Sequence, residues 1–335
     1  ALDAAFAAAL SADQAEYGHA LVDDRLAGVA RARFEADGVA ADHLTVVSGA
    51  MDAVERLLLT HLRSGDKVGV EDPGYAAVLQ LVGGLGFEAV PIEIDEEGVL
   101  PEALERALEA GVSAVVLTPR SHNPTGAAFT AARASAIDAV LRSFPSVLVI
   151  EDDHAGPVSG SSAFPLDHRR DRWAVVRSAS KSLGPDLRVA LLVGDQDTID
   201  RVEGRLQVGP GWVSHLLQRA VAFLLEDPAA QASVARAAEL YAVRRQGLID
   251  RLHAHGIPAQ GPSGLHVWVP VPDEQMVVGA MADHGFAIRA GERYRLASPP
   301  AVRVTTAALA EPELDRLANT LASVLRPRRA RSHLA

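Results

Sequence analysis

The sequence predicts an α/β fold in which a mostly parallel central sheet with flanking helices precedes a smaller α+β C-terminal domain. Between about residues 45 and 225, short β-rich runs alternate with longer helical patterns, which is typical of βαβ units. From Pro228, a long Arg- and Ala-rich helical pattern leads into a different mixture of strands and helices. With 335 residues, the chain is long enough for more than one hydrophobic core.

The strands expected in the first part are short and apolar. They cover Leu44–Val47, Val68–Val70, Glu88–Ile92, Ala114–Leu117, Val147–Ile150, Ala174–Val176 and Val189–Val193. The helices expected between them cover Asp52–Leu62, Tyr75–Gly84, Pro101–Glu109 and Ala131–Arg142. Because ligands bind at the carboxyl ends of strands in open α/β sheets, the polar loops that follow these strands should meet at one edge.

We expect four segments along the chain. They are an N-terminal segment at 1–44 that makes dimer and small-domain contacts, a large ligand-binding domain at 45–227, a small C-terminal domain at 228–325, and a basic, disordered tail at 326–335. The small domain should contain strands at His266–Val269 and Val302–Thr305 and helices at Glu274–His284 and Glu311–Leu325.

Composition excludes several classes of function. The net charge of −11 argues against a broad cationic surface, so we expect no direct nucleic-acid binding by this chain. The absence of cysteine excludes disulfides, thiolate nucleophiles and Cys-ligated metals. The N-terminus lacks a basic stretch before its short apolar run, and the apolar runs are too short to span a bilayer. We therefore expect a cytoplasmic protein without a signal peptide or membrane segment.

Lysine occurs only at Lys67 and Lys181, whereas the other basic side chains, histidines aside, are arginines. Unlike arginine, a lysine with a lowered pKa can form an imine with an aldehyde. Lys67 lies in a polar turn and is expected at the surface. Lys181 ends the segment Ser178-Ala179-Ser180-Lys181, which Arg188 follows. These hydroxyls and charges suit a phosphate and a carbonyl group, and no GxxxxGK pattern precedes Lys181. An ordinary polar loop is the alternative.

Asp152 ends an apolar strand after Glu151. A carboxylate in a semi-buried crevice is costly unless it is paired, and a protonated pyridine nitrogen would be a suitable partner. The competing interpretation is metal binding by Glu151, Asp152, Asp153 and His154, for which no second ligand cluster with suitable spacing is evident. The turn Asn123-Pro124-Thr125-Gly126 offers an amide that could donate to a phenolate oxygen, although it is also an ordinary Pro-Gly turn.

Taken together, these motifs resemble those of fold-type I, class I/II aminotransferases, which use pyridoxal 5'-phosphate (PLP). The matching segments, in the family's order, are Ser48-Gly49-Ala50, Pro73-Gly74-Tyr75, Asn123-Pro124-Thr125-Gly126, Glu151-Asp152-Asp153, Ser178-Ala179-Ser180-Lys181 and Arg188. The resemblance extends from about Tyr17 to Arg303 and implies the fold of a fold-type I PLP-transferase.

The resemblance implies a role for each matching residue. Lys181 would form the Schiff base and move protons, Asp152 would pair with the pyridine nitrogen, and Asn123 would contact the ring 3'-oxygen and the substrate. Tyr75 would stack on the ring, unless it is a core tyrosine. The phosphate would be held by Ser48, Gly49, Ala50, Ser178, Ser180 and Arg188, and by Tyr17 of the neighbouring subunit of a homodimer. Arg303 would bind the substrate carboxylate, unless it is an exposed strand arginine.

One position departs from the family pattern. Where the family usually has a tyrosine shortly after the aspartate, this sequence has His154 and then Ala155-Gly156. Either His154 takes the role of that tyrosine, or Asn123 contacts the 3'-oxygen alone, or His154 is a core histidine. Recognition of the substrate side chain is expected from the loops at 209–212 and 263–266.

The resemblance implies an aminotransferase that moves an amino group between an amino acid and a 2-oxo acid. The chain resembles most closely the aminotransferase-like domain of MocR-type regulators. The features that carry this resemblance are the sequences around Tyr75 and Asp152 and the spacing from Lys181 to Arg188. The alternative is therefore a PLP-binding effector domain with little turnover, separate here from the DNA-binding module. Another PLP reaction, such as β-elimination or decarboxylation, also remains open.

Overall fold

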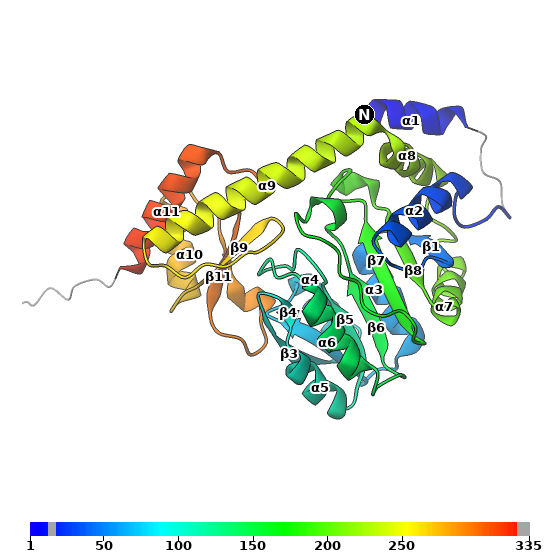
Figure 1. The fold of residues 1–335 in the computed structure, drawn as a ribbon, viewed down its shortest axis with the longest axis horizontal. Helices are drawn as coiled ribbons and strands as arrows, with labels where there is room; N and C mark the ends of the chain where they lie inside the picture. Colours follow the sequence, from blue (N-terminus) through cyan, green and yellow to red (C-terminus); the bar gives the residue numbers. More distant parts are fainter. Residues whose placement is uncertain (13–17, 327–335) are drawn as a thin grey trace, which may run out of the picture.

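The computed structural model describes residues 1–12 and 18–326, and within them eight strands form one sheet (Figure 1). The strand order is β1-β8-β7-β6-β5-β2-β3-β4. The strands are β1 (His43–Val47), β2 (Lys67–Asp72), β3 (Glu88–Asp95), β4 (Gly98–Val99), β5 (Val112–Leu117), β6 (Leu148–Asp152), β7 (Trp173–Ser178) and β8 (Ala190–Gly194). All seven strands expected from the sequence in this part of the chain are present.

The sheet is mostly parallel, which confirms the predicted α/β class. Strands β2, β3, β5, β6 and β7 pair in parallel with their neighbours. The exceptions are β8, which runs antiparallel to β1 and β7, and the short hairpin of β3 and β4. The carboxyl ends of β2, β5, β6 and β7 therefore lie at one edge of the sheet, and the loops that carry the sequence motifs meet there.

Helices pack on both faces of the sheet. Residues of β5 alternate between the two cores, with Ala114 and Val116 in one and Val115 and Leu117 in the other, as the two-residue period of a strand requires. The first core takes residues from α3 (Ala50–His61), α4 (Ala76–Gly84) and α7 (Gln196–Gln207), and the second takes them from α5 (Pro101–Glu109) and α6 (Ala131–Leu141). The four helices expected between the strands are all present, with ends shifted by at most two residues.

Further helices were not anticipated from the sequence. A third core joins α1 (Leu2–Ser11), α2 (Asp24–Ala36) and α8 (His215–Glu226) to the end of the sheet that carries β1, β7 and β8. The side chain of Asp23 caps α2 by accepting from the amides of Arg25 and Leu26, a common N-cap arrangement. Helix α2 packs against α8 and β1 in this core.

A second, antiparallel sheet lies at the other end of the molecule (Figure 1). It consists of β9 (His266–Pro270), β10 (Arg289–Ala290) and β11 (Ala301–Thr305), in the order β10-β11-β9, and packs with α10 (Glu274–Asp283) and α11 (Glu311–Leu325). The 27-residue helix α9 (Pro228–Ala254) extends from α8 to α11 and the second sheet (Figure 1). Pro228 is the first residue of α9, and the division of the chain into domains remains a prediction.

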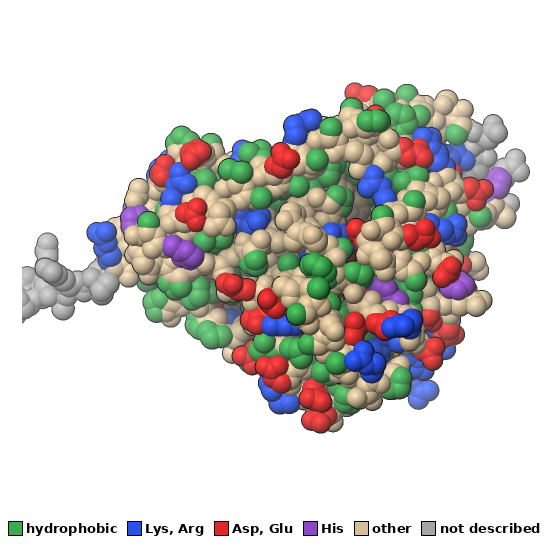
Figure 2. Space-filling view, in the orientation of Figure 1, with side chains coloured by type: hydrophobic (Ala, Val, Ile, Leu, Met, Phe, Trp, Pro, Cys, Tyr) green, Lys and Arg blue, Asp and Glu red, His purple; other side chains and the backbone are tan. Residues whose placement is uncertain are grey.

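Two expectations concern residues that the structure does not describe. Tyr17 and residues 327–335 of the expected tail lie outside the described ranges. Of the helices within those ranges, none combines the length and apolar character needed to cross a membrane. On the face shown in Figure 2, arginine side chains are interspersed with aspartates and glutamates, and no broad basic patch is visible on it.

Candidate cofactor site

A cavity of about 210 Å³ lies at the carboxyl ends of the parallel strands. Nine of the residues predicted for the site line it, namely Ala50, Tyr75, Asn123, Asp152, His154, Ser178, Ser180, Lys181 and Arg188. Ser48 and Gly49 directly precede Ala50, which is the first residue of α3. The sequence motifs, which are up to 140 residues apart along the chain, are thus brought together in one place.

One end of the cavity is built to hold an anion. Gly49 has a φ of +113° at the N-cap of α3, and a Cβ there would lie 2.6 Å from Nη2 of Arg188. Only glycine therefore allows both this backbone conformation and the close approach of the guanidinium. Arg188 Nη2 donates to the carbonyl oxygen of Ser48 at 3.2 Å. The amides at the start of α3 and the guanidinium could together hold a phosphate group.

Lys181 lies in the turn after β7, and its side chain is exposed toward the cavity. Its amine has no hydrogen-bond partner within the described part of the chain. Ser180, the preceding residue, has a buried hydroxyl oxygen that also lacks a partner there. An amine and a hydroxyl with unfilled hydrogen-bonding capacity are what a bound phosphate and carbonyl compound would use.

Asp152, at the end of β6, is 3% exposed and has a carboxylate oxygen, Oδ1, that is buried without a hydrogen-bond partner among the residues that the structure describes. Its other oxygen, Oδ2, lies 3.7 Å from Nδ1 of His154. Burial raises the pKa of Asp152 from its usual value, and the nearby His154 partly offsets this rise. A buried carboxylate of this kind is costly, and a cationic ring N–H placed in the cavity would satisfy it.

The rings of Tyr75 and His154 line the cavity and are nearly parallel. Their planes differ by 21° and their centroids lie 6.5 Å apart. Both side chains are partly buried and line the cavity. Tyr75 also packs against the core beneath α3 and α4, so its role at the cavity remains a prediction, as does that of His154.

Arg303 reaches the site from the second sheet. Its Nη1 donates to Oδ1 of Asn123 at 2.8 Å, and its guanidinium lies 4.9 Å from the ring centroid of Tyr294. Its Nε is buried without a partner among the described residues. Burial lowers the pKa of Arg303, although an arginine remains charged. It is therefore not an exposed strand arginine, and it has a donor available for a carboxylate.

His266 also lines the cavity, as does Leu265 before it. Sequence reasoning named the loop that contains them but did not assign His266 to the site. Burial, followed by the charge of Arg303, holds the pKa of His266 well below its usual range, so the ring is neutral at pH 7. The other loop expected to recognise the substrate, at 209–212, does not line this cavity, and Trp212 is 39% exposed.

The acidic string at the end of β6 does not converge on one point. Glu151 lies 2.8 Å from Nε2 of His168, Asp152 faces the cavity, and Asp153 pairs with Arg120 and Arg177. Within residues 1–12 and 18–326, no group of three or more His, Asp or Glu side chains is arranged to hold a metal ion.

The sheet topology and this constellation define the fold-type I class of PLP-dependent transferases. In agreement, the model of the family described as aminotransferase class I and II matches residues 16–321. The chain therefore belongs to the aminotransferase class I and II family.

Among curated proteins, the chain is similar both to regulators and to aminotransferases. It is 41% identical over 306 residues to the vitamin B6 salvage pathway transcriptional repressor PtsJ of Salmonella typhimurium, covering 90% of this chain and 71% of PtsJ. It is 28% identical over 289 residues to the pyridoxine biosynthesis transcriptional regulator PdxR of Corynebacterium glutamicum, covering 80% of this chain and 61% of PdxR. This agrees with the predicted resemblance to MocR-type regulators.

Among solved structures, the fold is similar to that of enzymes. A kynurenine aminotransferase of Pyrococcus horikoshii superposes with a TM-score of 0.85 at 22% identity, covering 95% of this chain and 83% of the enzyme. An archaeal alanine:glyoxylate aminotransferase superposes with a TM-score of 0.87 at 18% identity, covering 97% and 86%. At these identities, the similarity establishes the fold.

Proposed function

We propose that this chain binds PLP at Lys181 and serves as the PLP-responsive effector domain of a MocR-type regulator. The observation that carries the PLP proposal is the buried and unpartnered Oδ1 of Asp152, which faces the same cavity as Lys181. The regulatory role is supported by the 41% identity to a repressor of vitamin B6 salvage. That relative is named for a pathway of vitamin B6, the vitamin from which PLP derives, which supports PLP as the ligand of this cavity.

The residues of the cavity fit each part of PLP. Asp152 would accept a hydrogen bond from the protonated ring nitrogen, which removes the cost of its buried charge. Tyr75 and His154 would cover the ring. The phosphate would be held by the start of α3, Ser180 and Arg188.

The chain's own residues could also support chemistry on an amino acid. When bound, PLP supplies an electron-withdrawing ring that stabilises negative charge at the substrate α-carbon. Lys181 is the residue that can carry a proton to and from that carbon. Arg303 would fix the α-carboxylate through a two-pronged contact, and the neutral His266 would help to exclude water from that side.

Aminotransferase turnover is the second candidate function. It is supported by the 2.8 Å contact between Arg303 and Asn123, because this contact would hold a guanidinium beside the cavity for the carboxylate of an amino acid or a 2-oxo acid. In this case, the substrates would be an amino acid and a 2-oxo acid. For either function we propose a homodimer, as expected from the family resemblance of Tyr17.

The two functions differ in turnover: an aminotransferase releases 2-oxo acid repeatedly, whereas an effector domain binds its ligand with little release. The purified protein would be loaded with PLP and mixed with a panel of L-amino acids, with and without a second 2-oxo acid as amino-group acceptor. The visible spectrum and the 2-oxo acid released from the amino acid would be measured over time. For an effector domain, we expect a spectral change that saturates with ligand but little 2-oxo acid. Repeated release of 2-oxo acid that requires both substrates would instead establish an aminotransferase. If PLP does not bind, both assignments are wrong.

A further inference from the structure

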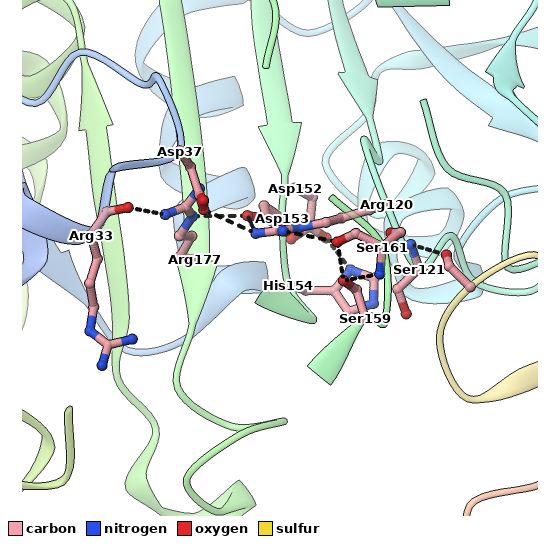
Figure 3. A network of polar contacts seen from close by, with 11 residues as sticks. Arg33, Asp37, Arg120, Ser121, Asp152, Asp153, His154, Ser159, Ser161 and Arg177 are labelled. Carbon is pink, nitrogen blue, oxygen red and sulfur yellow. Dashed lines mark hydrogen bonds and ion pairs between the residues drawn. The ribbon is translucent and has the colours of Figure 1, made fainter. Parts of the chain in front are cut away.

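Next to the cofactor cavity lies a cluster of two carboxylates and two guanidinium groups, formed by Asp37, Arg120, Asp153 and Arg177 (Figure 3). Asp153 accepts from Nε and Nη2 of Arg120 at 2.7 and 2.8 Å and from Nε of Arg177 at 2.8 Å. Asp37 lies 2.7 Å from Nη2 of Arg177 and 3.4 Å from Nη2 of Arg120. We call these four residues the ion cluster.

Three members of the ion cluster adjoin loops of the cofactor site. Asp153 directly follows Asp152, and Arg177 directly precedes Ser178. Arg120 lies three residues before Asn123 in the loop after β5. The cluster therefore joins the loops that present the ring-nitrogen partner, the phosphate ligands and the 3'-oxygen contact.

The fourth member, Asp37, lies at the C-terminal end of α2. Asp37 is the C-cap residue of α2, and Arg177 also donates from Nη1 to the carbonyl oxygen of Arg33 in α2 at 3.1 Å. The guanidinium of Arg177 lies 4.4 Å from the ring centroid of Phe34, which is a cation–π contact. In Figure 3, Asp37 and Arg33 approach Arg177 from one side, whereas Asp153 lies between Arg177 and Arg120.

Burial makes the cluster sensitive to the loss of a member. The side chains of Asp153, Arg120 and Arg177 are 3%, 7% and 13% exposed, and that of Asp37 is 36% exposed. Removing the charge of Asp37 leaves two guanidinium groups that share one carboxylate, and breaking partly buried ion pairs in this way is costly. The loops can respond by shifting, which would displace Asp152 and Ser178 from the cavity wall.

We propose that Asp37 couples α2 to the cofactor site, so that PLP binding and the docking of α2 stabilise each other. This inference rests on the proposed binding of PLP and assigns a regulatory output to that site. Asp37 acts as a positioning residue, because it reaches the cavity only through Arg177, Arg120 and Asp153. Coupling of this kind is reciprocal, so a change at Asp37 must alter PLP affinity, and PLP must alter the stability of α2.

Hydrogen exchange and PLP titration of the full chain test the coupling. In the wild type, PLP should slow amide exchange in α2 (Asp24–Ala36) more than in α5 (Pro101–Glu109), which packs on the same sheet away from the cluster. In Asp37→Asn, the PLP dissociation constant should rise on the order of three- to tenfold, and the additional slowing in α2 should be lost. Asp37→Glu, which restores the charge, should recover part of both effects.

A matched control is available on the same helix. Arg25 forms an exposed ion pair with Glu226 of α8, so Arg25→Gln removes an ion pair that also anchors α2 but is outside the cluster. This variant should keep wild-type PLP affinity and the PLP-dependent slowing in α2. If Arg25→Gln and Asp37→Asn behave alike, Asp37 has only a general structural role.

The outcomes separate this inference from the proposed function. Normal PLP binding at Lys181 with no selective change of exchange in α2 would overturn the coupling alone. This result is obtained on the wild type, so it does not depend on how well a variant folds. Absence of PLP binding would overturn both the coupling and the proposed function.

Discussion

Nη1 of Arg303 donates to Oδ1 of Asn123 at 2.8 Å, which joins strand β11 of the second sheet to the loop after β5 of the first. The two residues are 180 positions apart. Asn123 is predicted to contact the cofactor ring and Arg303 to bind a carboxylate. Their contact therefore connects the two parts of the proposed site, and each residue restricts the orientation of the other.

We expect Arg303→Gln to weaken the binding of amino acids and 2-oxo acids while leaving PLP bound. The lost hydrogen bonds to a carboxylate are worth about 1.5–3 kcal/mol, or roughly ten- to a hundredfold in affinity. Spectral titration of the PLP-loaded protein with amino acids measures this effect. Arg289→Gln is the control, because Arg289 lies on β10 directly opposite Arg303 of β11 and its side chain is exposed. Equal losses in both variants would indicate a general effect of charge.

Asp152→Asn should make the PLP-free protein more stable at neutral pH. Burial raises the pKa of Asp152 in the folded state, so the folded protein holds this proton more tightly than the unfolded chain. Stability therefore falls as the pH rises from about 4 through the raised pKa, and it stays lower above that pKa. Asparagine removes this loss. Thermal unfolding from about pH 4 to about pH 8 should show an advantage for the variant that shrinks as the pH is lowered.

The same substitution should impair PLP binding by about a hundredfold or more, because the ring nitrogen loses its charged partner. Asp152→Asn would thus gain stability and lose cofactor affinity. A variant with wild-type PLP affinity would show that Asp152 does not contact the ring nitrogen. Identical unfolding of the two proteins at every pH would show that the buried charge carries no cost.

Gly49→Ala should weaken PLP binding about tenfold, because its Cβ would displace Arg188 from the phosphate end of the cavity. It should also cost about 1–3 kcal/mol of stability, since Gly49 has a φ of +113°. Gly204→Ala in α7 is the matched control, because nothing lies within 4 Å of the added Cβ. That variant should gain about 0.5–1 kcal/mol. Inorganic phosphate should compete with PLP less effectively in Gly49→Ala than in the wild type, which would locate the defect at the phosphate end of the cavity. An unaltered affinity of Gly49→Ala for PLP would argue against this placement of the phosphate.

Much of the fold and of the candidate site could be predicted from the sequence, because strands, helices and the motifs that follow them are recognised from neighbouring residues. The apolar runs that end at Val47, Leu117 and Ile150 are followed by polar motifs, and the rule for parallel sheets brings such loops to one edge. The scarcity of lysine made Lys181 conspicuous. The side chain of Asp152 could be assigned to the cavity because it ends a buried strand.

The features that the sequence did not reveal depend on contacts between distant segments. The pairing of Arg303 with Asn123 and the ion cluster around Asp153 join segments with no common periodicity. The string of acidic residues from Glu151 to Asp153 suggested a shared ligand, whereas alternation along β6 and the turn after it direct each side chain to a different partner. His266 was missed because it is an ordinary strand residue in the sequence. Its position in the loop named for substrate recognition was the only available signal.

The most direct test of the central claim is borohydride reduction of the PLP-loaded protein followed by peptide mapping. The chain has two lysines, Lys67 and Lys181. Lys67 donates to the carbonyl oxygen of Ala110 at the surface, so it serves as an internal control. We predict a single phosphopyridoxyl adduct on Lys181 and the loss of the visible absorption band in Lys181→Ala but not in Lys67→Ala. An adduct on Lys67, or none on Lys181 despite PLP loading, would contradict the assignment of Lys181 as the PLP-binding residue.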